Sequence, residues 1–370
     1  MPVKEKEYPF YLKTTVILFG LILLTYTFSV LGDILIPLAF AAFIAILLNP
    51  LCNRLQKKMH KIPAILVTLL IAIICFAGLL YFLSSQIAQF SESFPTLKQK
   101  FIVSTAQLEQ WVQLKFGIAT QKQVQFVKDA LDNSQALLGK TVGTVLGTLG
   151  LIFLIPVYIF MMLFYKTLIL NFIFEVFKEE HSKNVADILK ETKLAVQSYI
   201  VGLLIEMVIV AVLNSTALLL LGVKYAILLG VIGAILNMLP YIGGIIAILL
   251  PILIATITKD GYSTQLGIII AYLVIQFIDN NIVFPRFVSI KVQINALISI
   301  VIVLLGNALW GIPGMFLSVP FVAVLKIIFD RIDDLKPWGK LLGDSVPTRY
   351  LGQRWGRNKK TVAEKIVEKS

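Results

Sequence analysis

Histidine and cysteine are scarce in this chain of 370 residues, which contains two cysteines and two histidines. His60 and His181 stand far apart and outside any His-Glu-x-x-His pattern, so the sequence excludes that metalloprotease motif and offers no Cys/His cluster for a metal. Cys52 ends one apolar run and Cys75 lies inside another, positions that imply no disulfide framework. We therefore predict no metal site and no disulfide.

Signatures of nucleotide binding and of nucleophilic hydrolysis are also missing. The chain has no Gly-x-Ser-x-Gly elbow and no glycine fingerprint for a dinucleotide. Gly139-Lys140-Thr141 resembles the end of a phosphate loop, but Ser134 stands where that loop requires its first glycine. We predict that the chain is not an enzyme and binds no cofactor, and that any transport is driven by a gradient or is passive.

Acidic residues are outnumbered, with 21 Asp and Glu against 33 Lys and Arg and a net charge of +12. That balance would favour nucleic acid in a soluble protein, but here 58% of the residues are hydrophobic and the mean hydropathy is +0.87. No soluble core of this size needs so much apolar sequence. We predict an all-α polytopic membrane protein in the lipid bilayer with no nucleic-acid partner, whose Lys and Arg collect on cytoplasmic loops.

Apolar runs and charge divide the chain into spans, connections and a tail. The loop 50–63 carries basic but no acidic residues, which places it in the cytoplasm together with the N-terminus; the basic tail is assigned there too. Between 84 and 140 the hydropathy falls and apolar residues recur at helical spacing, which is typical of a cap or of interfacial helices. We expect about eight hydrophobic segments in four regions: N-terminal transmembrane helices (1–83), an amphipathic helical cap (84–140), a transmembrane transport core (141–328) and a basic cytoplasmic tail (329–370).

Two long apolar segments of the core are interrupted by glycine and proline, around residues 237–244 and 306–314. Each half is short, because at 1.5 Å per residue it reaches only about two-thirds of a roughly 30 Å hydrocarbon core. We interpret each segment as a re-entrant helical hairpin, whose freed backbone groups must be buried in protein or line a wet cavity. The break residues that we expect at a binding site are Asn237, Pro240, Gly243, Gly244, Asn307, Gly311, Pro313 and Gly314.

Ionisable and amide side chains inside the apolar spans are the other candidates. Glu206 lies in the middle of one span, where a charge is costly and seldom faces lipid. A second polar stripe follows one face of the span 264–284. We expect a role in transport or coupling for Glu206, Gln276, Asp279, Asn280 and Arg286. A purely structural hydrogen-bonded role for Glu206, and an Asp279–Arg286 pair that only compensates charge, are the alternatives.

Gly139, Gly143 and Gly147 recur at four-residue intervals where a span is expected to begin at Val142. Small residues at this spacing allow a neighbouring helix backbone to approach closely. The stripe indicates either helix packing inside one subunit or the interface of a homo-oligomer.

The block Gln276–Arg286, the following Asn295-Ala296-Leu297 and the stretch Gly311–Pro320 resemble the autoinducer-2 exporter family, also called PerM-like permeases. Pro240-Tyr241-Ile242-Gly243 fits the same family, and the resemblance covers roughly residues 10 to 345. It implies a bacterial inner-membrane transporter. Some members are associated with export of autoinducer-2 and others with exchange of sodium or lithium for protons. Many members have His-Pro where this chain has Asn295-Ala296, so Asn295 joins the candidate site residues without a titratable group.

These features favour a secondary transporter that moves a small polar solute or signalling molecule by alternating access around the two hairpins. Glu206 and Asp279 are the expected coupling carboxylates. A sodium (lithium)/proton antiporter would use the same carboxylates, a passive oligomeric pore would use the glycine stripe, and a membrane scaffold would transport nothing. The paired breaks favour transport, since a scaffold needs no interrupted helices at membrane depth.

Overall fold

The computed structural model describes residues 9–116, 149–177, 182–239, 243–259, 261–288 and 294–344. Within these ranges the chain is helical, and the one extended pairing is an isolated bridge between Ile294 and Gly343. The predicted all-α fold is confirmed. Six helices are long and apolar enough to cross a membrane, or seven if a bent pair counts as one span. The expected eight segments are therefore an approximate count, reached only when the short apolar helices of the first hairpin are added.

The described helices are named by their bounds. In chain order they are α1 (Phe10–Val30), α2 (Gly32–Gln56), α3 (Lys61–Phe116), α5 (Leu149–Phe164), α6 (Lys166–Val176), α7 (Ser182–Leu220), α8 (Ala226–Asn237), α9 (Gly243–Thr258), α10 (Ser263–Ile278), the π-helix η2 (Asp279–Val283), α11 (Phe284–Phe287), α12 (Ala296–Arg331), the 3-10 turn η4 (Asp333–Leu335) and α13 (Lys336–Leu342).

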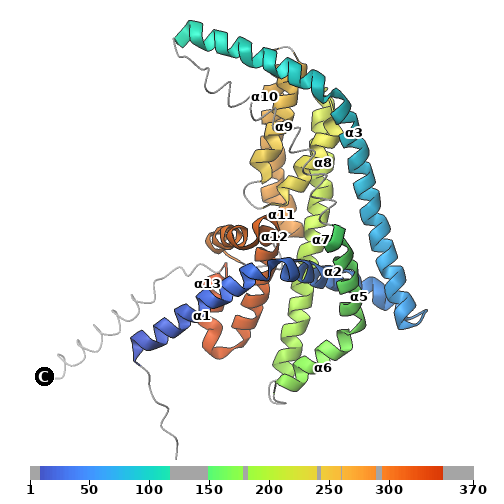
Figure 1. Ribbon diagram of the computed structural model, residues 1–370, viewed down its shortest axis with the longest axis vertical. Helices are drawn as coiled ribbons and strands as arrows, with labels where there is room; N and C mark the ends of the chain where they lie inside the picture. Colours follow the sequence, from blue (N-terminus) through green and yellow to red (C-terminus); the bar gives the residue numbers. More distant parts are fainter. Residues whose placement is uncertain are drawn as a thin grey trace, which may run out of the picture.

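Helix α7 runs along most of the long axis of the molecule, and the other helices gather around its two halves (Figure 1). In Figure 1, α8, α9 and α10 flank its upper half, while α2, α5, α6 and α12 surround the lower half. Leu218 of α7, Leu229 of α8 and Ala255 of α9 belong to one buried apolar cluster. A second cluster joins α2, α3 and α5 through Ala41, Ile65 and Ile159. Each half of the molecule thus has its own packed core.

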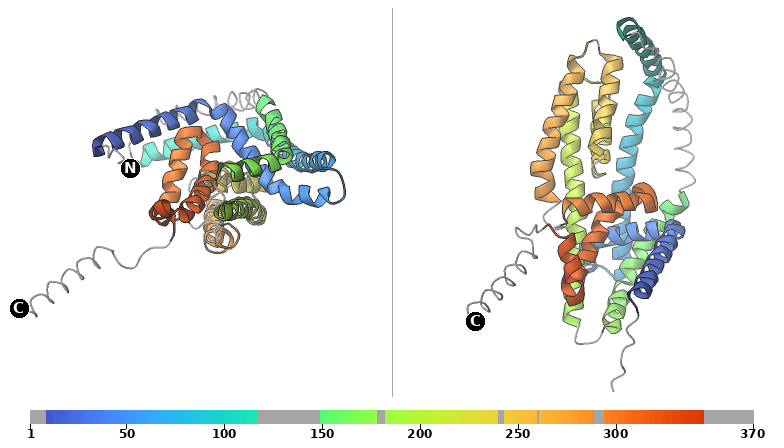
Figure 2. Two further views of the ribbon diagram at one scale, coloured as in Figure 1. Left: turned by 90° about the horizontal axis from the view of Figure 1, so that it is seen from below. Right: turned by 90° about the vertical axis from the view of Figure 1, so that its left-hand side faces the viewer.

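Much of the outer surface is apolar. Helix α1, at the edge of the molecule in both views of Figure 2, exposes large side chains along its length and its spanning window has no buried residue. Exposing so many Leu, Ile and Phe side chains to water would be costly, whereas lipid tails are an equally apolar solvent for them. The chain is accordingly a multi-pass membrane protein.

The first hairpin consists of α8, which packs against α7, and α9, which returns antiparallel alongside α8. A Cβ added to Gly233 of α8 would lie 3.5 Å from the Cβ of Ala247 of α9, so the two helices approach closely. At the break, a Cβ on Gly243 would overlap the carbonyl of Leu236, which explains why the returning helix starts on glycine. Pro240 lies outside the described residues. The helical break at this point is as the sequence predicts.

The second hairpin is α12, whose helix is interrupted at Trp310 and Gly311. Gly311 has φ 62° and ψ −143°, a conformation that essentially only glycine adopts. Eight residues of continuous helix advance about 12 Å, yet a Cβ on Gly314 would overlap the carbonyl of Gly306. The chain therefore folds back on itself, as the U-shaped turn in the lower part of Figure 1 shows. That each hairpin enters and leaves the membrane on the same side stays a prediction.

Several local expectations differ from the structure. The loop expected after Pro50 is largely helical, because α2 continues to Gln56. Pro156 lies inside α5, and a bend of 62° follows at Tyr165, where α5 and α6 meet. Helix α3 continues without a break into the region 84–140 that is predicted to form a cap. The assignment of this region as a cap stays a prediction. Gly139, Gly143, Gly147 and the expected start of their span lie outside the described residues.

Candidate functional site

A cavity of about 870 Å³ lies between α7, the first break, α10, η2 and the two arms of α12. Six of the predicted site residues line it: Glu206, Asn237, Gly244, Gln276, Asp279 and Asn280. They come from parts of the chain that are separated by up to about 70 residues, and the packing on α7 brings them together. Tyr199, Tyr272, Ser299 and Asp344 add further polar groups, and the remaining lining side chains are apolar.

Helix α7 delivers Glu206 to this cavity. Gly202 lies one turn earlier, and a Cβ there would overlap the carbonyl of Phe287, so the missing side chain lets α11 lie directly against α7. Glu206 is 4% exposed, and no described residue gives its Oε2 a hydrogen bond. A buried carboxylate oxygen without a partner is costly in an apolar setting. Helix packing alone would favour an apolar residue at this position, so Glu206 is a candidate for a functional role.

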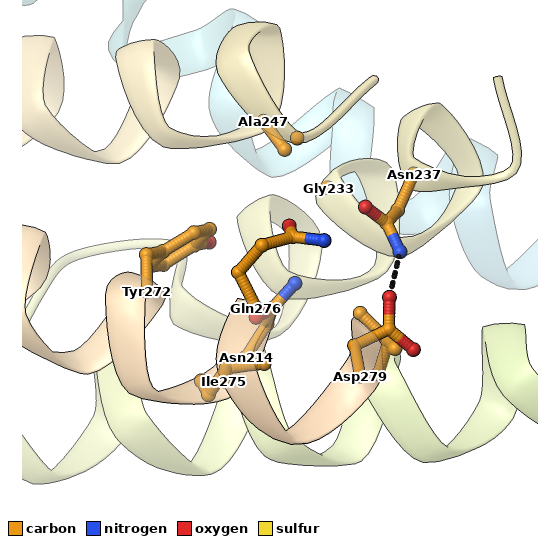
Figure 3. Close-up of a pocket in the computed structure, with 10 residues that line it drawn as sticks. Asn214, Gly233, Asn237, Ala247, Tyr272, Ile275, Gln276 and Asp279 are labelled. Atoms are coloured by element: carbon orange, nitrogen blue, oxygen red, sulfur yellow. Dashed lines mark hydrogen bonds between the residues drawn. The ribbon is translucent and has the colours of Figure 1, made fainter. Parts of the chain in front are cut away.

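The π-helix η2 places Asp279. The backbone N–H of Phe284 donates to the carbonyl of Asp279, five residues earlier, which is the π-helical spacing. The next residue, Pro285, has no N–H with which to continue the α-helical hydrogen bonds. Asp279 is 3% exposed, and its Oδ2 accepts a hydrogen bond of 2.8 Å from Asn237 Nδ2 at the first break (Figure 3). Its Oδ1 has no partner in the part of the chain that the structure describes. Single π turns inside helices are frequent at functional sites.

A small chamber adjoins this bond, with room of about 10 Å³, close to what one water molecule needs. Asn214, Asn237, Tyr272 and Gln276 line it, and Figure 3 shows their side chains gathered beneath Gly233. Asn214 Oδ1 and the Tyr272 hydroxyl find no hydrogen-bond partner among the described residues. Amide and hydroxyl side chains with unused hydrogen-bonding capacity therefore line a space that is large enough for one small occupant.

Asn214 was missed by the sequence analysis, although a signal was present. It follows Glu206 by eight residues in the same apolar span, with Val210 between them, so the three lie on one face of α7. All three are buried. An amide in a spanning helix, in phase with a carboxylate, would have identified it.

Other predicted site residues lie elsewhere. Arg286 is exposed on α11 and does not line the cavity, and among the described residues no ion pair joins it to Asp279. Gly243 is buried at the break itself. Asn295 caps α12, accepting the amide of Ile298 at 2.9 Å.

The two breaks do not line the same cavity in this structure. The cavity is lined by both arms of α12, at Ser299 and Val319, but not by its break. None of the second-break candidates reaches the cavity: Asn307, Gly311, Pro313 and Gly314. The physical reason is packing, since the glycines of that break contact each other and Trp310 Nε1 donates to the Phe28 carbonyl of α1 at 2.9 Å.

Comparison with known proteins agrees with the resemblance seen in the sequence. The sequence model of the AI-2E family transporter matches residues 16–334, which is most of the chain. The chain belongs to the AI-2E transporter family. The matched AI-2E region contains the first hairpin, η2, both arms of α12 and every carboxylate discussed so far.

Relatives within the AI-2E family align over most of their length. The AI-2 transport protein TqsA of Escherichia coli is 24% identical over 336 residues, covering 90% of this chain and 96% of TqsA. YueF of Bacillus subtilis is 25% identical over 319 residues, covering 82% of this chain and 85% of YueF. A Haemophilus influenzae protein is 26% identical over 326 residues, 85% of this chain and 91% of its own. The last two are named as candidate transport proteins without a substrate.

Within the described ranges, no three His, Cys, Asp or Glu side chains come together as a metal-binding group. The cavity offers instead carboxylate, amide and hydroxyl groups on an apolar background, which suits reversible binding of a polar solute. The arrangement can bind and release, and it can accept and return a proton or a small cation.

Proposed function

We propose that this AI-2E family protein is a secondary transporter that moves a small polar solute through the 870 Å³ cavity. Glu206 and Asp279 are its coupling carboxylates. The observation that carries the proposal is that both acids are buried, line the same cavity and each keep one oxygen without a partner among the described residues. Ionisable groups at membrane depth mark substrate and ion pathways. A proton or cation that binds there would supply the missing partner.

The first solute to test is autoinducer-2, because TqsA is named an AI-2 transport protein. The volume of the cavity falls within the roughly 300–1,000 Å³ of small-molecule sites. Asn280, Gln276 and Ser299 in its wall supply hydrogen-bond donors and acceptors for a hydroxylated solute.

A second candidate function is exchange of sodium or lithium for protons. The small chamber beneath Gly233 supports it, because Asn214, Tyr272 and Asp279 line room for about one water and each has a side-chain oxygen without a partner in the described residues. Oxygen atoms are the ligands that hard cations prefer. In this alternative the chamber holds the cation and Asp279 exchanges it for a proton.

The proposed location is the bacterial inner membrane, with both termini on the cytoplasmic side. The support is the basic, acid-free loop 50–63 together with the basic residues after 326. Impermeant labelling of single cysteines introduced into that loop, in intact cells and in inverted vesicles, tests this orientation.

Reconstitution of the full chain in proteoliposomes tests the function, with parallel measurement of proton, sodium and autoinducer-2 flux. We expect gradient-coupled flux that falls at least tenfold in Glu206→Gln and Asp279→Asn, because each change removes a proton-binding charge. Asp33→Asn is the matched control, an exposed acid at the start of α2 outside the cavity. Both cavity variants retaining full flux, or flux that does not respond to any gradient, would overturn the proposal.

A further inference from the structure

The charged residues in the lining of the large cavity are all acidic. Besides Glu206 and Asp279 there is a third, Asp344, and no described Lys, Arg or His lines the wall. Glu206 and Asp279 are buried, whereas Asp344 is exposed. The cavity therefore extends from two buried carboxylates to a third at its accessible end, here called the mouth.

Asp344 reaches the mouth because Asn295 holds the preceding residues. The side-chain Nδ2 of Asn295 donates to the Leu341 carbonyl at 2.7 Å and to the Gly343 carbonyl at 3.2 Å. The backbone N–H of Asn295 donates to the Leu342 carbonyl at 3.1 Å. Its neighbour Ile294 forms the antiparallel bridge with Gly343. The start of α12 and the end of α13 are thus joined immediately before Asp344.

The other side of α13 is fixed to the returning arm of α12. A Cβ on Gly339 would overlap Asp330 Oδ1, so α13 lies directly on that arm. A Cβ on Gly343 would lie 3.4 Å from Lys326 Cε. Asp344 is consequently held between both arms of the second hairpin rather than at the end of a free strand.

We infer that Asp344 is a solute-contacting residue at the cavity mouth, that Asn295 is its positioning residue, and that the mouth admits cations and neutral polar solutes in preference to anions. The inference rests on the proposed function only in that the solute passes through this cavity. The exposed Asp344 carboxylate, with no base among the described lining residues, gives the mouth a negative potential, which raises the local concentration of cations and lowers that of anions. The second hairpin thereby contributes to the site through its ends, although its break does not.

The test uses a reporter cysteine and needs no transport. In a full-length background with Cys52→Ser and Cys75→Ser, Ser299→Cys places a thiol in the cavity wall, and Leu297→Cys places one on the same helix outside it. Each thiol is labelled with a cationic trimethylammonium-ethyl and an anionic sulfonatoethyl methanethiosulfonate, and the two rates are compared. We expect the cationic preference at position 299 to exceed that at 297 by about fivefold.

Changes at the mouth should remove that preference. Asp344→Asn should lower the ratio of cationic to anionic rates at position 299 by about fivefold, while Asp344→Glu should retain it. Asn295→Ser separates two roles, because serine still caps α12 but is too short to hold Leu341 and Gly343. It should lower the ratio as Asp344→Asn does, while the thermal midpoint stays close to that of the parent.

Three outcomes would overturn the inference. They are an unreactive thiol at position 299, equal ratios at 299 and 297, and a ratio that Asp344→Asn leaves unchanged. Labelling that behaves as expected in a protein without gradient-coupled flux would reject the transport proposal and keep the assignment of the mouth. Coupled flux together with any of the three contrary labelling results would keep the transport proposal and reject the assignment of the mouth.

Discussion

The two hairpins start from the same sequence signal and reach different surroundings. In the first, the helix breaks beside Asn237, whose amide donates to the buried Asp279, and the break lines the large cavity. In the second, Gly306 and Gly314 contact each other and Trp310 packs against α1, away from that cavity. Glycine and proline decide where a helix stops, but the neighbours of the break decide whether it becomes a site.

The difference lies in how each break satisfies polar groups. At the first break, Asn237 donates a hydrogen bond to Asp279 Oδ2, while Asp279 Oδ1 has no partner among the described residues. A bound proton, cation or solute could supply that partner. Trp310 donates to Phe28 near the C-terminal end of α1, where helix carbonyls lack an intrahelical partner. If the proposed function is right, the first interruption is the binding break of this chain and the second is an architectural break.

Matched asparagine variants at the two breaks provide the largest expected contrast. Asn237→Ala removes the donor to Asp279 and should lower gradient-coupled flux about tenfold or more, because hydrogen bonds to charged groups contribute roughly 1.5–3 kcal/mol. Asn307→Ala changes an exposed amide outside the cavity and should leave flux within twofold. The measurement is flux in proteoliposomes at equal reconstituted protein. Equal losses in the two variants would remove the distinction between the breaks.

A glycine substitution at the second break should affect stability instead. Gly314→Ala places a Cβ on the backbone carbonyl of Gly306, which cannot move as a flexible side chain would, so we expect a loss of about 3 kcal/mol. The thermal midpoint in detergent reports it. Gly20→Ala and Gly78→Ala are the controls, because a Cβ at either position meets nothing within 4 Å. If Gly314→Ala matched these controls, the arms of α12 would not be packed as described.

The contrast between the breaks also marks what could be predicted from sequence. The helical class, the interruptions and the buried acids Glu206 and Asp279 follow from local patterns: long apolar runs, glycine and proline, and charge where lipid excludes it. Which break meets Asp279 depends on contacts between residues far apart in the chain, such as Asn237 and Asp279, and no periodicity reports those. The same holds for Asn295, whose partners lie 46 to 48 residues away.

The π-helix was missed for a related reason. Asp279 falls in phase with Gln276 and Tyr272 on an ordinary helix, so the sequence places it on the correct side. The wider turn that follows depends on Pro285, whose missing amide leaves the register free to change, and on the packing of α11 against Gly202. Local chemistry permits that change, and tertiary contact selects it.

Gly311 tests whether the second break is fixed by backbone conformation. A Cβ there meets nothing within 4 Å, so Gly311→Ala creates no clash and its cost comes from the positive φ alone. We expect a loss of about 1–2 kcal/mol in stability, smaller than for Gly314→Ala, with coupled flux per folded molecule unchanged. The thermal midpoint and flux are measured on the same preparation. A loss of flux without a loss of stability would instead place this break in the transport cycle.

The smallest expected effect is at the contact between Trp310 and α1. Trp310→Phe keeps an aromatic ring beside Phe28, whose centroid lies 6.3 Å from that of the Trp310 ring, but removes the indole N–H that donates to the Phe28 carbonyl. Interhelical hydrogen bonds in membrane proteins contribute about 0.6 kcal/mol on average, so the shift should be close to that value.

Trp310→Leu serves as the comparison, since it removes the ring as well as the N–H and should cost more. An architectural break requires both variants to retain coupled flux while stability falls in that order. If Trp310→Phe abolished flux as Asn237→Ala is expected to do, α1 and the second break would have to move together during transport, and the division between a binding break and an architectural break would no longer hold.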